Sequence, residues 1–492
     1  MIKKILIANR GEIAMRLVRA AHDMGMECVV VYAQDDAQAL HVRAADAAVA
    51  LNATGPAAYL DGERLVNIAR QQGCDALHPG YGFLSERADF AMTCASADLC
   101  FIGPTPAHLA LFGDKASARK LALSQHVPLM PGLDHAVSLA EAEAFFASQQ
   151  TGAQTTPIVI KAIGGGGGRG MRVVNTAAEL PEAYARCVSE ARAAFGVDGV
   201  YVERLMQRAR HIEVQVIGDG HSVMALGERE CSIQRRFQKL IEIAPSPSLS
   251  PAMREQITTA ALRIARACQY RSLGTFEFLV DETSNDLPFV FIEANARLQV
   301  EHTITEAVTG LDLVQLQMGV ASGKSLQELG LDAASPPKSQ GFAVQWRINA
   351  ETLDAQGQAL PSSGTLNQFN LAQGPGIRVD THGFGGCTPS PHYDSLLAKL
   401  IVHSTGDFAQ TARRSRRALA ECTIGGVDTN LALLQAIAAR PEWESQQVHT
   451  RFVEQHLVDL VDAAKAFTTN SIANNAHLTS GKQVFESKHA DT

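Results

Sequence analysis

The chain has 492 residues, of which 46% are hydrophobic and 19% are charged, and its formal net charge is −8. This length exceeds what one hydrophobic core usually serves, so several domains are expected. The acidic balance argues against nucleic-acid binding, and no apolar run is long enough to cross a membrane. Nine scattered cysteines without a C-x-x-C pair, and an N-terminus that begins directly with a strand pattern, predict a reduced, cytoplasmic protein without a structural zinc site.

The first hundred residues alternate between strand and helix patterns, which predicts a parallel α/β sheet. The turn at residues 9–12 lacks the G-x-G-x-x-G fingerprint, and this argues against a nicotinamide dinucleotide fold. A loop at residues 78–86 follows a strand, where α/β proteins place ligands, although it would also serve as a tight turn into a helix. The expected strands are 2–8, 28–32, 76–78 and 99–102, and the expected helices are 13–24 and 61–71.

Five consecutive glycines at residues 164–168 are the most informative stretch of the chain. Glycine contributes no side chain and loses the most entropy on folding, so such a loop is useful where backbone N–H groups approach phosphate oxygens. Lys161 ends the apolar strand before the loop, and residues 171–174 read as the returning strand. The pattern favours a lid over a nucleotide triphosphate; a flexible linker is the alternative. Lys115, which follows the expected helix cap Asp114, is a second candidate for the phosphates or else a solvated lysine.

Two apolar strands, residues 274–279 and 289–302, carry acids and are expected to form a hairpin. Period two places Glu293, Asn295 and Arg297 on one face, with Gln299 and Glu301 following if the strand continues. Together with Glu277 they supply oxygens that suit Mg²⁺ or Mn²⁺, while Arg297 suits a planar anion. A structural ion-pair ladder is the alternative. Upstream, residues 211–215 also alternate, so His211, Glu213 and Gln215 share one face, and Ser250-Pro251 is expected to begin a long helix.

The composition shifts near residue 335, where short strands and Pro336-Pro337 suggest a third, mixed α+β domain. The basic run at 413–417 is interpreted as a solvated helix face rather than a nucleic-acid patch. Residues from about 466 onward are rich in Asn, Ser, Lys and His and are expected to form a loose tail.

The chain resembles the biotin carboxylase family of the ATP-grasp superfamily from residue 1 to about 455. The resemblance rests on eight segments in order: IANRGEIA, HPGYGFLSE, FGDKASAR, KAIGGGGGRGMRVV, ERECSIQRR, GTFEFL, FIEANARLQVEHTITE and HYDSLLAKL. It implies a multidomain α/β and α+β protein. The implied parts are an N-terminal parallel α/β domain (1–114), an ATP-grasp domain (115–334) with a mobile lid at about 132–203, a mixed α+β C-terminal domain (335–460) and a flexible tail (461–492).

The resemblance also implies ATP- and bicarbonate-dependent carboxylation of biotin through carboxyphosphate, with Mg²⁺ or Mn²⁺. Glu301 would be the base that deprotonates bicarbonate, and Arg347 would stabilise the biotin enolate. The other implied site residues are Lys115, Lys161, Gly167 and Gly168 for the phosphates; Glu203, Arg204, Leu205, Met206, His211, Gln234 and Phe237 around the nucleotide; Glu277, Glu293 and Asn295 for the metal; and Lys239, Arg297, Gln299 and Val300 around bicarbonate.

Several positions depart from the family pattern. Phe237 stands where the family usually has histidine, which predicts weaker nucleotide affinity with the chemistry retained. Ala294, Ala296 and Trp346 replace the usual residues and are expected to alter biotin access. Near the family's dimer interface, Phe369 keeps the usual aromatic ring without the neighbouring arginine, and a homodimer is still expected.

No lysine follows any of the eleven methionines, so the biotin-acceptor motif is missing. Biotin is therefore expected on a separate biotin carboxyl carrier protein, with a separate carboxyltransferase subunit. Two other functions stay open: another ATP-grasp ligase that activates a different carboxylate, and a catalytically impaired nucleotide-binding scaffold. The final acceptor, whether acetyl-CoA, another acyl-CoA, pyruvate or another molecule, also stays open.

Overall fold

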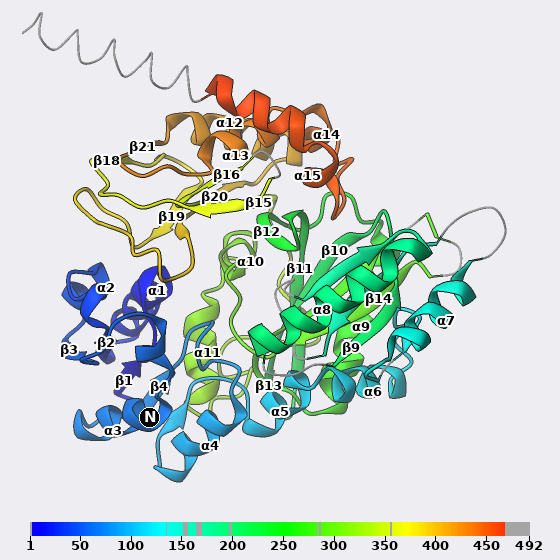
Figure 1. The fold of residues 1–492 in the computed structure, drawn as a ribbon. Helices are drawn as coiled ribbons and strands as arrows, with labels where there is room; N and C mark the ends of the chain where they lie inside the picture. Colours follow the sequence, from blue (N-terminus) through cyan, green and yellow to red (C-terminus); the bar gives the residue numbers. More distant parts are fainter. Residues whose placement is uncertain are drawn as a thin grey trace, which may run out of the picture.

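The computed structural model describes residues 2–133, 135–150, 156–163, 170–195, 199–281, 283–284, 287–354 and 357–467 (Figure 1). The glycine run, including Gly167 and Gly168, lies outside these ranges, as do residues 468–492 of the predicted tail. Within them, no helix combines the length and the apolarity that a membrane crossing requires.

The N-terminal region forms the predicted parallel sheet, with strand order β3-β2-β1-β4-β5. Its central strands are continuous apolar runs because helices cover both faces. The strands are β1 (Lys4–Ile7), β2 (Glu27–Tyr32), β3 (Ala47–Ala50), β4 (Ala76–His78) and β5 (Cys100–Phe101). The helices are α1 (Gly11–Asp23), α2 (Leu40–Ala44), α3 (Gly62–Gln71), α4 (Ala88–Ser96) and α5 (Pro106–Gly113).

An antiparallel sheet, eight-stranded in the described residues, has the order β14-β13-β10-β11-β12-β15-β20-β19. Because β12 pairs with β15, the ATP-grasp region and the C-terminal region share one continuous sheet. Its strands are β10 (Arg210–Asp219), β11 (Val223–Arg235), β12 (Gln238–Ala244), β13 (Arg271–Val280), β14 (Phe289–Asn295), β15 (Phe342–Asn349), β19 (Ile377–Thr381) and β20 (Leu396–Ser404). The predicted hairpin of the two acidic strands is β13–β14.

A small antiparallel sheet of order β6-β9-β7-β8 lies in the segment predicted as the lid. Helix α7 begins at a capping box, in which Ser138 and Glu141 satisfy each other's backbone amides. Its apolar face and that of α8 pack on the sheet through Phe145, Phe146 and Leu180. The elements are β6 (Gly132–Leu133), β7 (Ile158–Ala162), β8 (Met171–Val174), β9 (Val200–Arg204), α7 (Leu139–Gln149) and α8 (Leu180–Phe195).

The remaining helices cover the large sheet. The predicted cap of the long helix is confirmed, since the Ser250 hydroxyl accepts the Met253 amide and Pro251 is the first helical residue. Asp114 likewise caps α6. These helices are α6 (Lys115–Ser124), α9 (Pro251–Ala267), α10 (His302–Thr309), α11 (Leu313–Ala321), α12 (Phe408–Glu421), α13 (Leu431–Ala438), α14 (Pro441–Glu444) and α15 (Phe452–Gln455). Short strand pairs are β16 (Glu351–Leu353) with β17 (Ala359–Pro361), and β18 (Gln368–Asn370) with β21 (Thr423–Gly425).

The N-terminal sheet and the large sheet share a hydrophobic core. Leu17 of α1 and Ile5 of β1 belong to the same buried cluster as Ile217 of β10, Leu273 of β13 and Leu313 of α11. A separate core lies under the C-terminal helices, where Trp346 and Trp443 contact each other. Because both ends of the large sheet are buried, polar side chains in its middle can be held rigidly.

Candidate active site

Acidic side chains form a row across the middle of the large sheet. Glu213 of β10 lies directly opposite Glu277 of β13, and Glu277 lies directly opposite Glu293 of β14. Directly paired residues of an antiparallel sheet point to the same face, so the register brings three carboxylates together; we call Glu213, Glu277 and Glu293 the acidic row. Such a row is costly unless cations neutralise it.

Lys239 of β12 is the central cation of this site. Its Nζ donates to Glu213 Oε2 at 2.6 Å, to Glu277 Oε1 at 3.0 Å and to Glu301 Oε1 at 2.8 Å. Burial works against the charge, yet the three carboxylates hold the pKa of Lys239 well above its ordinary value. Conversely, burial alone would raise the pKa of Glu277, but Lys239 and His211 hold it well below the ordinary range. Lys239 and Glu277 are therefore both charged at neutral pH.

Glu301 is completely buried at the N-terminus of α10 and uses both carboxylate oxygens. Oε1 accepts from Lys239, and Oε2 accepts from Arg347 Nη2 at 3.1 Å. The Arg347 Nε also donates to Glu242 Oε1 at 2.5 Å. Although burial would raise the pKa of Glu301, Lys239 and Arg347 lower it well below its ordinary value. As it stands, Glu301 is a stable carboxylate rather than a poised proton acceptor.

The expectation that the second strand continues to Glu301 is wrong. Strand β14 ends at Asn295, and residues 296–301 form a turn that leads into α10. Gln299 and Glu301 thus reach the site because the turn redirects the chain, not because of period two. Arg297 within the turn contacts the N-terminal region, since its Nε lies 2.9 Å from Glu86 Oε2 of the loop at residues 78–86, and its Nη1 donates to Gln299 Oε1 at 2.9 Å.

The lid sheet presents a second group of charges. Lys161 Nζ of β7 donates to Glu203 Oε2 at 2.5 Å, and Arg119 Nη1 of α6 donates to Glu203 Oε1 at 2.7 Å. Burial lowers the pKa of Lys115, while Glu293 opposes this shift, so Lys115 lies within electrostatic range of the acidic row. The amides of Arg204 and Leu205 donate to the carbonyls of Pro131 and Pro157. These two amides are therefore not available to a ligand, and residues 203–206 can contact one only through their other backbone groups and their side chains.

His211 contacts the acidic row at Glu277, and Gln234 contacts His211. The Gln234 amide nitrogen lies 2.6 Å from His211 Nδ1, and His211 Nε2 lies 2.8 Å from Glu277 Oε2. Phe237 is placed differently, at the turn between β11 and β12, where it is 37% exposed and has a φ of 66°. Both turn residues, Arg236 and Phe237, have positive φ. Such turns usually contain glycine, so nothing in the sequence indicated this backbone conformation.

Three substitutions expected to alter biotin access do not face the site. Ala294 and Ala296 are buried in the core beneath the large sheet. Trp346 is fully buried against Trp443, with ring centroids 5.1 Å apart, because it alternates with Arg347 along β15. These three side chains therefore lie in the core, and their effect on biotin access stays a prediction.

Glu277, Glu293 and Asn295 fit a divalent cation by their chemistry. Two carboxylates directly opposite each other repel, and a hard divalent ion that takes oxygen ligands would stabilise them. In the structure the Asn295 amide nitrogen donates to Glu277 Oε1 at 2.7 Å, so the Asn295 side-chain amide would have to rotate to turn its oxygen toward the ion.

The sequence did not reveal three charged residues of the site, namely Arg229, Glu242 and Arg119. Arg229 is fully buried and donates to Glu213 Oε1 at 2.5 Å, but β11 is buried on both faces and shows no alternation that would have marked it.

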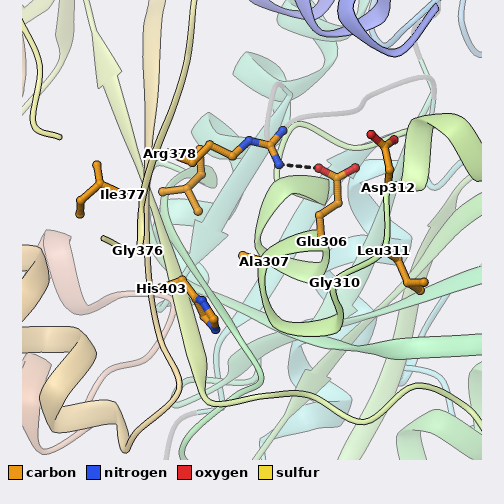
Figure 2. A pocket seen from close by; sticks show the side chains of 10 residues that line it. Glu306, Ala307, Gly310, Leu311, Asp312, Gly376, Ile377, Arg378 and His403 are labelled. Atoms are coloured by element: carbon orange, nitrogen blue, oxygen red, sulfur yellow. Dashed lines mark hydrogen bonds and ion pairs between the residues drawn. The ribbon is translucent and has the colours of Figure 1, made fainter. Parts of the chain in front are cut away.

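A cavity of about 380 Å³ lies apart from the predicted site residues, between α10 and strands β19 and β20. Figure 2 shows the Arg378 side chain reaching across it to Glu306, with Asp312 beside them. Arg378 Nη1 and Glu306 Oε2 are 2.7 Å apart. This ion pair joins the C-terminal region to α10.

Family models match three consecutive parts of the chain. Residues 1–109 match the biotin carboxylase N-terminal domain, residues 114–329 the ATP-binding domain of the carbamoyl-phosphate synthase L chain, and residues 345–455 the biotin carboxylase C-terminal domain. Among curated proteins, pyruvate carboxylase 1 of Caenorhabditis elegans is 44% identical over 457 residues, covering 92% of this chain and 38% of the relative. Pyruvate carboxylase of Bacillus subtilis is 44% identical over 460 residues and is covered to 39%. The chain thus spans about two-fifths of the length of these relatives.

Solved structures are similar over nearly the whole chain. The biotin carboxylase domain of a single-chain bacterial carboxylase is 46% identical with a TM-score of 0.83, covering 94% of this chain and all of that one. The biotin carboxylase domain dimer of Hydrogenobacter thermophilus 2-oxoglutarate carboxylase, in complex with MgADP, ADP and bicarbonate, is 38% identical with a TM-score of 0.86, covering 94% of this chain and 99% of that one. Campylobacter jejuni biotin carboxylase is 37% identical with a TM-score of 0.86, covering 93% and 99%.

Proposed function

The chain belongs to the biotin carboxylase family of ATP-grasp ligases, and on that premise we propose that it carboxylates biotin with ATP and bicarbonate through carboxyphosphate. The observation that carries this proposal is Lys239, which joins the acidic row to Glu301 in one ionised cluster. The cluster connects a place for metal-bound phosphates to a place for a small anion.

Phosphoryl transfer needs positioning and charge neutralisation more than covalent help from the protein. Lys115, Lys161, Gly167 and Gly168 would bind the phosphates, while Glu203 to Met206 would hold the adenine and ribose. His211, Gln234 and Phe237 would complete the nucleotide site. Mg²⁺ or Mn²⁺, held by Glu277, Glu293 and Asn295, would neutralise the charge that develops on the phosphates.

Bicarbonate would bind beside Arg297, Gln299, Val300 and Lys239. A second anion gives Lys239 a new partner, which loosens its hold on Glu301 and raises the proton affinity of that carboxylate. Glu301 would then take the bicarbonate proton while a bicarbonate oxygen attacks the γ-phosphorus and ADP leaves. The resulting carboxyphosphate would release CO₂ beside biotin, and its phosphate would take the N1 proton. Arg347 would stabilise the enolate oxygen that forms, and N1 would then attack the CO₂ carbon to form the N–C bond of carboxybiotin.

We propose four parts of the chain: an N-terminal domain (1–114), an ATP-grasp domain (115–334) with the lid at about 132–203, a C-terminal domain (335–460) and a tail (461–492).

We also propose that the chain forms a homodimer in the cytoplasm. Its proposed partners are a biotin carboxyl carrier protein and a carboxyltransferase subunit. The nine cysteines, all free in the structure, support a reducing compartment. The similar proteins carry names of different carboxylases, so the carboxyltransferase would choose the acceptor.

The test is bicarbonate-dependent ATP cleavage measured with and without free biotin. Stimulation by biotin supports the proposal. Bicarbonate-dependent cleavage that ignores biotin would favour another ATP-grasp ligase, and no turnover with retained ATP binding would favour a scaffold. Capture of a biotinylated polypeptide by the tagged chain from its own cells tests the separate carrier.

A further inference from the structure

Three side chains of ligand type meet in the N-terminal region, away from the acidic row. His22 lies in the last turn of α1, Cys28 in β2, and Asp46 just before β3. His22 Nε2 is 3.1 Å from Asp46 Oδ2 and 3.5 Å from Cys28 Sγ, and all three atoms lie within 4.8 Å of one another. None of the three is a predicted site residue or belongs to the reaction proposed above.

The spacing matches the edges of a tetrahedral metal centre. Bond lengths of about 2.3 Å to sulfur and about 2.0–2.1 Å to nitrogen and oxygen put the sulfur–nitrogen edge at roughly 3.5 Å and the nitrogen–oxygen edge at roughly 3.3 Å. The observed 3.5 Å and 3.1 Å differ from these by at most a few tenths of an ångström. Two of the three donor spacings thus already fit a tetrahedral centre, and the third pair, sulfur and oxygen, lies within 4.8 Å.

The chemistry of the donors selects the class of ion. Imidazole and thiolate suit Zn²⁺ and Co²⁺ rather than Mg²⁺ or Ca²⁺. Cys28 is buried while His22 and Asp46 are exposed, so a fourth position would face solvent. The Asp46 carboxylate also accepts the Cys28 amide at 2.8 Å, which fixes its orientation toward the sulfur.

We propose that His22, Cys28 and Asp46 bind a divalent ion of the zinc class, with a solvent molecule as the fourth ligand. The ion would tie the end of α1 to the outer strands of the parallel sheet.

Titration of the full chain with Co²⁺ tests the proposal, because a cobalt–thiolate bond gives a charge-transfer band in the near ultraviolet. We expect one such site in the unmodified chain, loss of the band in Cys28→Ser, and retention in Cys74→Ser, whose thiol is half-buried beside Asp75. His22→Ala, at an exposed position, should weaken binding more than about tenfold even if Cys28→Ser folds poorly. A band that survives Cys28→Ser, or no band in the unmodified chain, would overturn the proposal.

A different observation carries a second inference, which rests on the proposed function. Lys399 of β20 is fully buried, and its Nζ lies 2.9 Å from Glu12 Oε1 of α1 and donates to the Val300 carbonyl at 3.2 Å. Tyr81 also donates to Glu12. Glu12, Tyr81 and Lys399 come from three of the segments that carry the family resemblance, yet none has a role in the reaction above.

The contact to Val300 fixes the peptide that precedes Glu301. Lys399 also lies directly opposite Arg347 in the sheet, so one strand pair positions both the Arg347 side chain and the Val300 peptide. We infer that Lys399 is a positioning residue that sets the distance between Glu301 and Arg347, using Glu12 of the N-terminal region as its anchor.

The test is a double variant, Lys399→Met with Glu12→Gln, which removes both charges and so avoids a buried unpaired carboxylate at Glu12. We expect a rise of about tenfold in the bicarbonate KM, with the ATP KM within about twofold. Equal losses for both substrates, or none, would overturn the inference. An unmodified chain without bicarbonate-dependent ATP cleavage would instead contradict the proposed function.

Discussion

Two buried ion networks contact neighbouring residues, one at the Glu301 side chain and the other at the Val300 carbonyl, and they differ in the solvent exposure of their lysine. The first contains the acidic row, Lys239 and Glu301. The second, which we call the junction network, consists of Glu12, Arg16, Glu306, Arg378, Asp380 and Lys399. Lys239 retains 14% exposure of its side chain, whereas Lys399 has none.

The difference in exposure implies that Lys239 can exchange an ion-pair partner, whereas Lys399 keeps its partners permanently. A cation that water can reach can exchange one carboxylate for a substrate anion at little cost, whereas a fully buried cation cannot. The junction network also joins all three regions of the chain, because Glu306 of α10 pairs with Arg16 of α1 at 2.9 Å and with Arg378 of β19 at 2.7 Å. We therefore interpret the first network as the binding machinery and the second as its support.

The largest expected effect breaks the first network. Lys239→Met leaves Glu213, Glu277 and Glu301 facing one another without their shared cation, so bicarbonate-dependent ATP cleavage should fall by at least about 100-fold. The free energy of unfolding should also fall by roughly 3 kcal/mol. Initial rates and urea denaturation measure both, with Lys120→Met on the exposed face of α6 as the matched control. A variant with more than a tenth of the normal rate would contradict the assignment.

The sequence predicted the acids of the site strand by strand but not their assembly. Period two marked Glu293 and placed Glu213 on one strand face with His211 and Gln215, whereas Glu277 was noted only as an acid within an apolar strand. The row itself depends on the register of β10, β13 and β14, which no local pattern encodes. Arg229 and Glu242 were missed because their strands are buried on both faces and so lack alternation.

The fold was predictable where local signals agree with packing. The alternating N-terminal units, the β13–β14 hairpin and the caps at Asp114 and Ser250 all follow from short-range chemistry. The pairing of β12 with β15 could not be predicted, because more than a hundred residues separate Ile241 from its partner Trp346. The burial of Trp346 against Trp443 could not be predicted either, since the face that it occupies depends on that pairing.

A smaller expected effect concerns the junction network, namely the dependence of folding stability on pH that arises from His302. Burial lowers the pKa of His302 well below its ordinary value, and Lys399, Arg16 and Arg378 add to this, against Asp380. The histidine is neutral when folded and binds a proton below about pH 6.5 when unfolded, so its stabilisation is present above that pH and is lost as the pH falls. The expected loss is roughly 1.4 kcal/mol per pH unit below 6.5.

His302→Asn keeps a donor for the Gln299 carbonyl, which His302 Nδ1 contacts at 2.8 Å, and removes the titration. Urea denaturation at pH 7.5, 6 and 5 should show a shallower fall in stability for this variant than for the unmodified chain. Parallel slopes for His302→Asn and the unmodified chain would show that the junction network does not sense pH through this residue.

A change in the C-terminal core should alter stability without altering the site. Trp346→Phe should reduce the free energy of unfolding by about 1–2 kcal/mol, because the smaller ring leaves space against Trp443. The KM for free biotin should stay within about twofold, since Trp346 faces away from Arg347. A large rise in that KM would restore the original expectation that this position controls biotin access.

The smallest effect concerns the turn that separates Lys239 from the solvent. Phe237→His should lower the ATP KM by a few-fold with kcat unchanged, because an imidazole adds a polar contact at the nucleotide site while Lys239, Glu277 and Glu301 keep their pairing. Phe237 has a φ of 66° and is partly exposed, and histidine tolerates that backbone at least as well, so stability should change by less than about 0.5 kcal/mol. Arg236→Lys at the neighbouring turn position serves as the control. An unchanged ATP KM for Phe237→His would mean that this exposed turn does not contact the nucleotide, and that affinity is set by the buried network alone.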